Sequence, residues 1–334
     1  ATGAHQRQPN GTGIGLTVPG IGLAIASVGL TLAQRFSSVP VEAVGDPVPA
    51  DGLTQWRRLP HSELQAVTRP RLIATDLDGT FLRPDGTVSA INAEAAARAN
   101  ELGVPFVIAT GRPTRWLGVL AELATAHPQV IVSNGGAVVE LATGRPVHQF
   151  PLDSATAFAV ADALRAAIPG ITFGFETGVG FGCEPDSPSR QRSEPGHHTG
   201  TLTELSESLG AVIKLLGFHP EIPSEQLTTL AAAVIGDQLN LTHASVSQPY
   251  GMIELTAPGV SKASTLALVC AELGIAAAEV VAFGDMPNDA EMLTWAGQGF
   301  VVANGHHSMK VCGFTEVPSN AEDGVGLTIL ELLS

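Results

Sequence analysis

Lysine and cysteine are scarce in this sequence, and charged residues as a whole are few. The 334 residues carry a net charge of −15, and charged side chains make up 15% of the chain. Because nucleic-acid binding requires clustered basic residues that neutralise phosphates, this balance argues against a general nucleic-acid-binding protein. The lysines are Lys214, Lys262 and Lys310. A lysine inside an apolar run is therefore a conspicuous feature of this chain.

The cysteines argue against two common kinds of site. Cys183, Cys270 and Cys312 lie far apart, are odd in number and form no Cys-x-x-Cys motif. This pattern disfavours both a disulfide framework and a structural zinc site. Such cysteine usage is typical of a reducing compartment, and we expect a cytoplasmic protein.

The first 70 residues differ in composition from the rest of the chain. Residues 13–33 are uncharged and mostly apolar, and this length is close to the roughly 20 residues that span a bilayer. Five glycines and Pro19 interrupt the segment, and no Ala-x-Ala cleavage site follows it. We expect residues 1–70 to form a poorly ordered extension. The alternative is membrane anchoring or export through residues 13–33, the one segment through which membrane contact is possible.

A regular alternation of short apolar runs and helical segments begins at Arg71. Such alternation is typical of an α/β fold with a doubly wound parallel sheet. A mixture of helices and strands interrupts it between residues 152 and 250, which predicts an inserted α+β domain. The predicted core therefore comprises residues 71–151 and 251–334. The expected core strands are 72–75, 104–109, 130–133, 252–255, 280–283 and 300–303.

Three further segments have specific expectations. Residues 81–88 contain Pro-Asp-Gly and are expected to form a small hairpin flap. Residues 184–200 are polar and proline-containing, and are expected to form a loop. A helix is expected to start at Pro113, which fits a first helical turn, and to reach about residue 125.

Two aspartates directly follow the first predicted strand. Residues 71–86 read RLIATDLDGTFLRPDG, so an apolar run leads straight into Asp76 and Asp78. Gly79 favours a turn of the backbone at this point. Open α/β sheets bind their ligands at the carboxyl ends of the strands. Two acids at one strand end repel each other unless a positive group balances them, so this stretch is a candidate functional site.

Other polar residues follow further predicted strands or begin predicted helices. They are Thr110, Gly111, Lys262, Asp285, Asn288 and Asp289. Carboxylates from separate strand ends form an all-oxygen site that suits Mg²⁺. A lysine, a hydroxyl and backbone N–H groups beside such a metal suit a phosphate. One carboxylate can attack phosphorus while its neighbour transfers protons, which indicates phosphoryl transfer.

These residues resemble the four motifs of the haloacid dehalogenase superfamily. The matching segments, in chain order, are DLDGT at 76–80, the strand that ends at Thr110, Lys262, and GDMPND at 284–289. The segments that resemble the Cof-type (subclass IIB) phosphatases are ATGR at 109–112 and SNGG at 133–136. The insertion between the second and third motifs also resembles these phosphatases. The resemblance covers about residues 71–334 and implies a Rossmann-like core with a C2B-type cap near residues 152–250.

The resemblance also implies a role for each matched residue. Asp76 would be the nucleophile and a metal ligand, and Asp78 would be the acid/base and bind Mg²⁺ through its carbonyl. Asp285 would complete the metal site. The groups expected to hold phosphate are the Leu77 backbone, Thr110, Gly111, Lys262 and Asn288. The residues expected to support these groups are Asp289, Arg112 and Asn134, and for the last two a purely structural role is the alternative.

Some residues depart from the family pattern or have no assigned role. Ala263 and the Met286-Pro287 pair stand where the family often has glycine, but neither departure removes a side-chain ligand. Lys214 lies in a predicted strand of the inserted domain. Two alternatives stay open for its side chain, contact with the substrate and exposure to solvent. The histidines expected to be exposed rather than metal ligands are His197, His198, His306 and His307.

The resulting prediction is a Mg²⁺-dependent phosphatase. It would hydrolyse small phosphorylated metabolites, with sugar phosphates as the first choice, through an aspartyl-phosphate intermediate. One alternative is a phosphomutase or phosphotransferase, which passes the phosphoryl group to a second hydroxyl. Another is a non-catalytic protein that binds a phosphorylated metabolite. The inserted domain would carry specificity but offers no motif, so the sequence predicts neither the substrate nor the oligomeric state.

Overall fold

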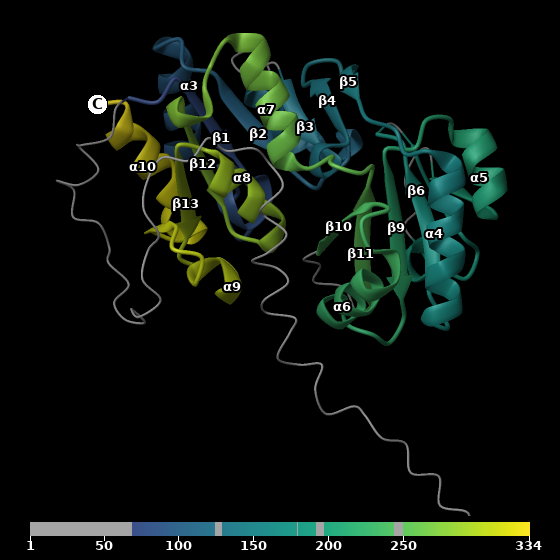
Figure 1. Cartoon of the computed structure of the whole chain (residues 1–334). Coiled ribbons are helices and arrows are strands. Elements are labelled where there is room, and N and C mark those ends of the chain that lie inside the picture. The colour runs from purple at the N-terminus through teal and green to yellow at the C-terminus, as the bar shows by residue number, and fades with distance from the viewer. Residues whose placement is uncertain (1–68, 124–128, 179, 192–196, 244–249) are drawn as a thin grey trace, which may run out of the picture. The chain divides into compact units, whose positions relative to one another are not determined.

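The computed structural model describes residues 69–123, 129–178, 180–191, 197–243 and 250–334, which form two sheets with their helices (Figure 1). All of them belong to one compact unit of the chain, Trp56–Ser334. The expectations for residues 13–33 and for nearly all of the N-terminal extension lie outside the described residues. Within the described part, no helix combines the length and hydropathy that a membrane span requires.

An eight-stranded sheet forms the core, in the order β14-β13-β12-β1-β2-β3-β4-β5. Neighbours from β14 to β3 run parallel, and β4 and β5 are added antiparallel at one edge. The predicted parallel sheet is thus confirmed, whereas β4, β5 and β14 were not predicted. The bounds are Leu72–Thr75 (β1), Phe106–Ala109 (β2), Gln129–Val132 (β3), Ala137–Glu140 (β4), Pro146–Gln149 (β5), Val280–Gly284 (β12), Gln298–Val302 (β13) and Thr315–Val317 (β14).

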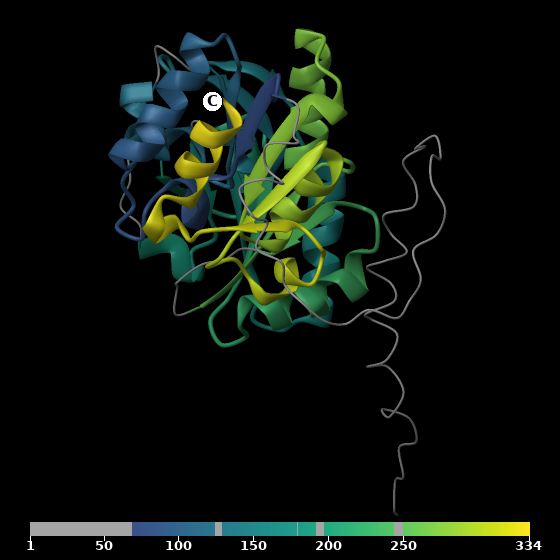
Figure 2. The same cartoon turned by 90° about the vertical axis from the view of Figure 1, so that its left-hand side faces the viewer.

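Helices cover both faces of the core sheet. Side chains alternate along β1, so Ile73 packs with α3 and α10 on one face, while Ala74 packs with α7 and α8 on the other. Figure 2 shows α10, in yellow, beside α3, in blue. Burial on both faces explains why the core strands read as continuous apolar runs. The helix bounds are Ala90–Glu101 (α3), Lys262–Leu273 (α7), Ala290–Trp295 (α8), His307–Lys310 (α9) and Gly324–Leu332 (α10).

Capping side chains fix where two of these helices begin. The Ser89 hydroxyl accepts a hydrogen bond from the Asn92 backbone N–H at 3.0 Å and starts α3. The Ser261 hydroxyl accepts one from the Ser264 backbone N–H at 3.2 Å and starts α7. Both caps satisfy backbone donors that the first helical turn leaves without partners. Lys262 is therefore held as the first residue of α7, with its side chain buried.

A six-stranded sheet, in the order β10-β11-β9-β6-β7-β8, forms the predicted α+β cap. Its pairs are antiparallel except β7 with β8. Three helices pack on one face, over Phe173, Leu215 and Ile253. The strands are Thr172–Glu176 (β6), Phe181–Cys183 (β7), His197–Thr199 (β8), Lys214–His219 (β9), Asn240–His243 (β10) and Gly251–Thr256 (β11). The helices are Ser154–Ala167 (α4), Leu202–Leu209 (α5) and Ser224–Ile235 (α6).

The structure corrects one assignment that affects the domain division. The run 252–255 was predicted as a core strand, but it forms β11, which pairs with β9 and β10 in the cap sheet. A short apolar run indicates a buried strand and does not indicate which sheet the strand joins. We propose that the second core segment begins between β11 and α7 rather than at residue 251.

Three smaller predictions also need correction. Residues 81–88 form a tight turn without strands, in which the Gly86 N–H donates to the Arg83 carbonyl at 2.8 Å. The segment 184–200 was predicted as loop but contains β8, because three of its residues continue the cap sheet beside β7. The predicted helix 113–125 is a 3₁₀ segment, Thr114–Leu123, and its expected end lies outside the described residues.

Candidate active site

Asp76 lies where β1 ends at the carboxyl edge of the core sheet. Its backbone N–H donates to the Phe283 carbonyl of β12 at 2.9 Å, which fixes the residue against the neighbouring strand. The side chain is buried, and its Oδ1 accepts a hydrogen bond from Lys262 Nζ at 2.5 Å. Among the described residues no donor contacts Asp76 Oδ2, so one carboxylate oxygen has no hydrogen-bond partner.

Lys262 bridges two of the predicted acids. Its Nζ donates to Asp76 Oδ1 and, at 2.7 Å, to Asp289 Oδ1. The side chain is 1% exposed, so this ammonium group is balanced by carboxylates rather than by water. The structure therefore brings together the strand end after β1, the start of α7 and the loop after β12, as the sequence predicts.

Asp285 and Asp289 come from the loop that follows β12. Asp289 Oδ2 accepts hydrogen bonds from the backbone N–H groups of Asp285 and Met286, each at 3.0 Å. Asp285 Oδ1 accepts a hydrogen bond from the Thr80 hydroxyl at 3.1 Å. Carboxylate oxygens of Asp76, Asp285 and Asp289 lie within 4.8 Å of one another. Both oxygens of Asp289 accept hydrogen bonds, from the lysine and from the backbone. Among the described residues, one oxygen of Asp76 and one of Asp285 accept none.

Burial controls the protonation of this cluster. Burial raises the pKa of Asp76 to about 7. The charge of Lys262 opposes this rise, and the charge of Asp289 adds to it. Burial also raises the pKa of Asp285 to about 8, and the charges of Asp76 and Asp289 add to the effect. For Lys262, burial lowers the pKa, but Asp289 and Asp76 outweigh it and the net pKa is raised. The cluster thus binds protons near neutral pH when no cation neutralises it.

The donor set of this cluster fits a hard divalent cation. The available oxygens of Asp76 and Asp285 come from two adjacent strand ends, and both side chains are buried. Such cations prefer a few carboxylate oxygens completed by water and substrate oxygens. A cation placed there would also relieve the repulsion that raises the pKa values of both acids.

Asp78 is not one of the three clustered acids and pairs with Arg112. The guanidinium donates from Nε to Asp78 Oδ2 at 2.7 Å and from Nη2 to Oδ1 at 2.6 Å. The Asp78 side chain is 54% exposed, so the pair lies at the mouth of the site. Arg112 also donates to the Trp116 carbonyl at 3.1 Å. Arg112 was expected to support the phosphate site, and its observed partner is the predicted acid/base.

The segments after β2 and β3 lie against each other beside the cluster. The buried Thr110 hydroxyl accepts a hydrogen bond from the Arg112 backbone N–H at 3.0 Å. The Thr110 carbonyl accepts one from the Asn134 N–H at 3.0 Å. Asn134 has a φ of 57° and its Oδ1 accepts from Asn288 Nδ2 at 3.1 Å. A left-handed asparagine inside a site is a strained feature that the surrounding contacts have to maintain.

Two asparagines that sequence reasoning missed hold the turn after Asp76. Asn304 Nδ2 donates to the Gly79 carbonyl at 2.7 Å, and Asn92 Nδ2 donates to the Phe81 carbonyl at 2.6 Å. Asn304 lies two residues after the end of β13. Of the four histidines that were expected to be exposed, His198 and His307 are exposed, whereas His197 and His306 are partly buried.

Two charged residues of the cap reach this site. Lys214 Nζ donates to the Gly111 carbonyl at 3.0 Å and to Glu254 Oε1 at 2.5 Å. Glu254 Oε2 accepts a hydrogen bond from Asn134 Nδ2. Lys214 is 2% exposed and therefore does not face bulk solvent, whereas contact with a substrate stays open. Glu254 was missed, although a glutamate inside an apolar strand is a visible signal.

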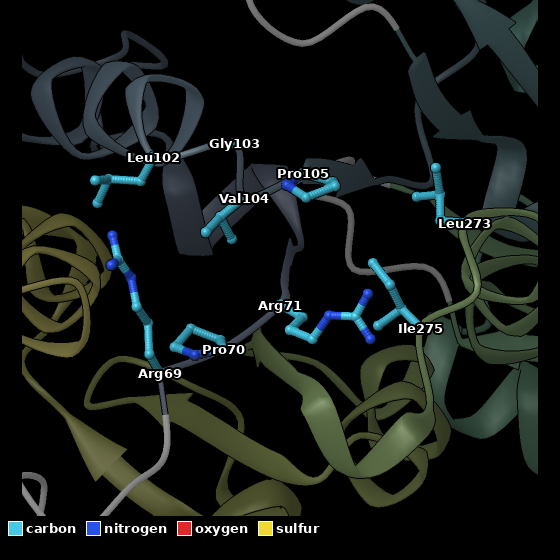
Figure 3. Close-up of a pocket in the computed structure, with 9 residues that line it drawn as sticks. All are labelled: Arg69, Pro70, Arg71, Leu102, Gly103, Val104, Pro105, Leu273 and Ile275. Carbon is cyan, nitrogen blue, oxygen red and sulfur yellow. The ribbon is translucent and has the colours of Figure 1, made fainter.

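A cavity of about 400 Å³ lies away from this cluster (Figure 3). Its lining includes Arg71 and Pro105, which precede β1 and β2, so it opens at the amino ends of the strands. Arg71 is already paired with Glu279 at 3.0 Å. The candidate site at the carboxyl ends of the same strands is therefore separate from this cavity.

Substitution of Gly79 by alanine is expected to disable the site. Gly79 has a φ of +81°, and an added Cβ would lie 2.3 Å from Asp285 Oδ2. Gly86→Ala is the matched control, because its φ is +79° and an added Cβ meets nothing within 4 Å. Both variants should lose about 1–2 kcal/mol through left-handed strain. Only Gly79→Ala should also lower catalytic turnover, by about a hundredfold or more. Equal turnover in the two variants would contradict this reading of the Gly79 contact.

The chain is similar to one family model and to individual known proteins. A family model described as haloacid dehalogenase-like hydrolase matches residues 73–329. A 5-amino-6-(5-phospho-D-ribitylamino)uracil phosphatase of Bacillus subtilis is 27% identical over 282 residues, covering 80% of this chain and 99% of that protein. An HMP-PP phosphatase of Escherichia coli is 25% identical over 236 residues, covering 70% of this chain and 84% of that protein.

A solved structure is similar in fold to this chain. It is described as a sugar phosphatase of subclass IIB of the HAD superfamily, and it superposes with a TM-score of 0.64 at 19% identity. The superposition covers 78% of this chain and 97% of that one. At this identity the likeness concerns the fold, namely the parallel core sheet with an inserted α+β cap.

Proposed function

This chain belongs to the haloacid dehalogenase-like hydrolases, and we propose that it is a Mg²⁺-dependent phosphatase of small phosphorylated metabolites, sugar phosphates first. The observation that carries the proposal is the buried Lys262 between Asp76 and Asp289, with Asp285 beside them. Phosphatase activity is also what the names of the similar Bacillus subtilis and Escherichia coli proteins state. Sugar phosphates are the first choice because the sequence-based prediction places them first.

Asp76 is the nucleophile in this mechanism. Its Oδ2 forms a bond to phosphorus while the bond from phosphorus to the leaving oxygen breaks, which gives an aspartyl-phosphate. Lys262 holds the other oxygen of Asp76 and presents positive charge to the phosphoryl group. The Thr110 hydroxyl, the Gly111 N–H and the Asn288 amide would supply further hydrogen-bond donors to the phosphoryl group. Bound Mg²⁺, held by Asp76 and Asp285, would neutralise charge on the transferring group.

Asp78 transfers the protons. It protonates the leaving alkoxide in the first step and takes a proton from the attacking water in the second. The bidentate contact with Arg112 occupies both carboxylate oxygens of Asp78, so this pair has to open before Asp78 can reach the leaving group or the attacking water. The Asp78 side chain is half exposed and stands where a substrate entering from solvent would meet it.

A panel of phosphorylated metabolites assayed with Mg²⁺ tests this function. We expect inorganic phosphate to be released, at rates typical of enzymes, about 1–10³ s⁻¹ on the preferred substrate. A chelator should abolish the release, and restored Mg²⁺ should recover it. An isomerised phosphate ester without free phosphate would instead favour the phosphomutase alternative. Tight binding of a phosphorylated metabolite without either product would favour the non-catalytic alternative.

We also propose a cytoplasmic location, on the basis of the cysteine usage in the sequence. The expectation of no nucleic-acid partner rests on the same composition and net charge. Both stand as predictions beside the phosphatase proposal.

A further inference from the structure

The face of the cap sheet that carries no helices bears a row of buried polar residues. Glu176 on β6 lies directly opposite Lys214 on β9 in the strand register. Glu254 on β11 lies opposite Leu216 of β9 and opposite Thr242 of β10. Glu176 and Lys214 are 2% exposed and Glu254 is 7% exposed. Charged groups buried to this degree require partners, and the partners indicate what the row is for.

These partners belong to the core rather than to the cap alone. Lys214 Nζ contacts the Gly111 carbonyl, and Asn134 Nδ2 donates to both Glu254 and the Thr242 hydroxyl. Asn134 in turn accepts from Asn288, one of the residues proposed to hold phosphate. The row is therefore one or two side chains from the proposed phosphate position. A leaving group that extends from this phosphate toward the cap would meet Lys214 and Glu254 first.

A second pair of charges completes the electrostatic balance of this surface. Glu176 Oε2 pairs with Arg115 Nη1 of the core at 2.6 Å. The two carboxylates of the row are thus matched by one lysine and one arginine. A leaving group with its own negative charge would approach two glutamates, and the surface has no excess of positive charge to attract it. An apolar leaving group would separate the charged partners and offer them no hydrogen bonds.

We propose that Lys214 and Glu254 determine substrate specificity by binding hydroxyl groups of a neutral, polyhydroxylated leaving group, an inference that rests on the proposed phosphatase function. Hydroxyls both donate and accept, so they can bond a carboxylate and an ammonium group at the same time. They can also replace the contacts that Lys214 and Glu254 now make with Gly111 and Asn134. A site built from such groups rejects analogues that lack the hydroxyls, because its buried polar atoms then remain without partners.

The test compares three substrates in the full-length protein with Mg²⁺. Glucose 6-phosphate has a neutral, hydroxyl-rich leaving group, p-nitrophenyl phosphate has none of these hydroxyls, and fructose 1,6-bisphosphate adds a second anionic group. Glu254→Gln keeps the shape of the side chain and removes its charge. We expect kcat/KM for glucose 6-phosphate to fall about tenfold or more, mainly through KM. For p-nitrophenyl phosphate the fall should be at least about fivefold smaller.

The rates with fructose 1,6-bisphosphate distinguish a specificity role of Glu254 from a purely structural role, which would leave the ratio between substrates unchanged. Removal of the Glu254 charge should raise the ratio of kcat/KM for bisphosphate over glucose 6-phosphate by about tenfold. Glu225→Gln, an exposed glutamate of α6 in the same cap, is the matched control and should change none of these values. If Glu254→Gln unfolds, Lys214→Met combined with Glu254→Gln removes both charges together and carries the same expectations.

The outcomes separate this inference from the function on which it rests. An equal fall for all three substrates means that Glu254 merely supports the site, and it overturns the specificity proposal alone. A wild-type preference for p-nitrophenyl phosphate or the bisphosphate over glucose 6-phosphate also overturns it, while the phosphatase function stands. No release of phosphate from any substrate overturns both.

Discussion

Replacement of Asp76 by asparagine is expected to abolish turnover and leave the fold intact. The amide keeps the size of the carboxylate but cannot attack phosphorus, so the covalent step has no nucleophile. Loss of a nucleophile typically costs several orders of magnitude, and we expect kcat to fall by about 10⁴ or more. Lys262 keeps Asp289 as its partner in the variant, so the buried ammonium group stays balanced. Phosphate release from the preferred substrate measures the effect.

The stability of Asp76→Asn separates a chemical role from a structural one. Burial holds the pKa of Asp76 at about 7, which means that its ionised form is disfavoured in the metal-free protein. A neutral amide at this position should therefore leave the melting temperature unchanged or raise it. Asp186→Asn, at an exposed cap position, is the control for removing one aspartate. Retained turnover in Asp76→Asn would exclude Asp76 as the nucleophile.

The acids and the lysine of the site were predictable because each is marked locally. Asp76 and Asp285 directly follow runs of buried apolar residues, and Lys262 begins a helix. Their meeting follows from the parallel pairing of β1 and β12, in which Thr75 lies beside Phe283. Parallel strands place their carboxyl ends at one edge of a sheet, so residues more than 200 positions apart in sequence become neighbours. Local signals and one topological rule were sufficient here.

The contacts between cap and core could not be predicted in the same way. Glu254 lies in a run that is equally compatible with a core strand and with a cap strand, and only long-range pairing with β9 decides between them. The Asp78 pair with Arg112 depends on the turn at Gly79, whose φ of +81° redirects the chain after Asp76. Such contacts depend on side-chain direction, which residue spacing does not determine once a strand has ended.

Replacement of Lys262 by methionine should have the largest effect on stability. The variant would leave the buried carboxylates of Asp76 and Asp289 without their shared cation, beside a third acid, Asp285. Removal of one partner from a buried ion pair typically costs about 3–5 kcal/mol, because the remaining charge stays desolvated. Lys310→Met is the matched control. Lys310 is 31% exposed and lies 3.7 Å from Glu316, so its loss should cost at most about 1 kcal/mol.

The pH dependence of this loss shows whether unbalanced carboxylates cause it. Burial raises the pKa of Asp76 above its ordinary value of 3.8, and Lys262 opposes that rise. Without the lysine the pKa of Asp76 should rise further. A raised folded-state pKa contributes stability that is complete below the unfolded pKa and is lost as the pH rises through the folded value. Chemical unfolding of Lys262→Met should therefore show a larger deficit at about pH 8 than at about pH 5. A deficit of equal size at both pH values would mean that lost packing, rather than uncompensated negative charge, destabilises the variant, and the electrostatic role of Lys262 would then have to be abandoned.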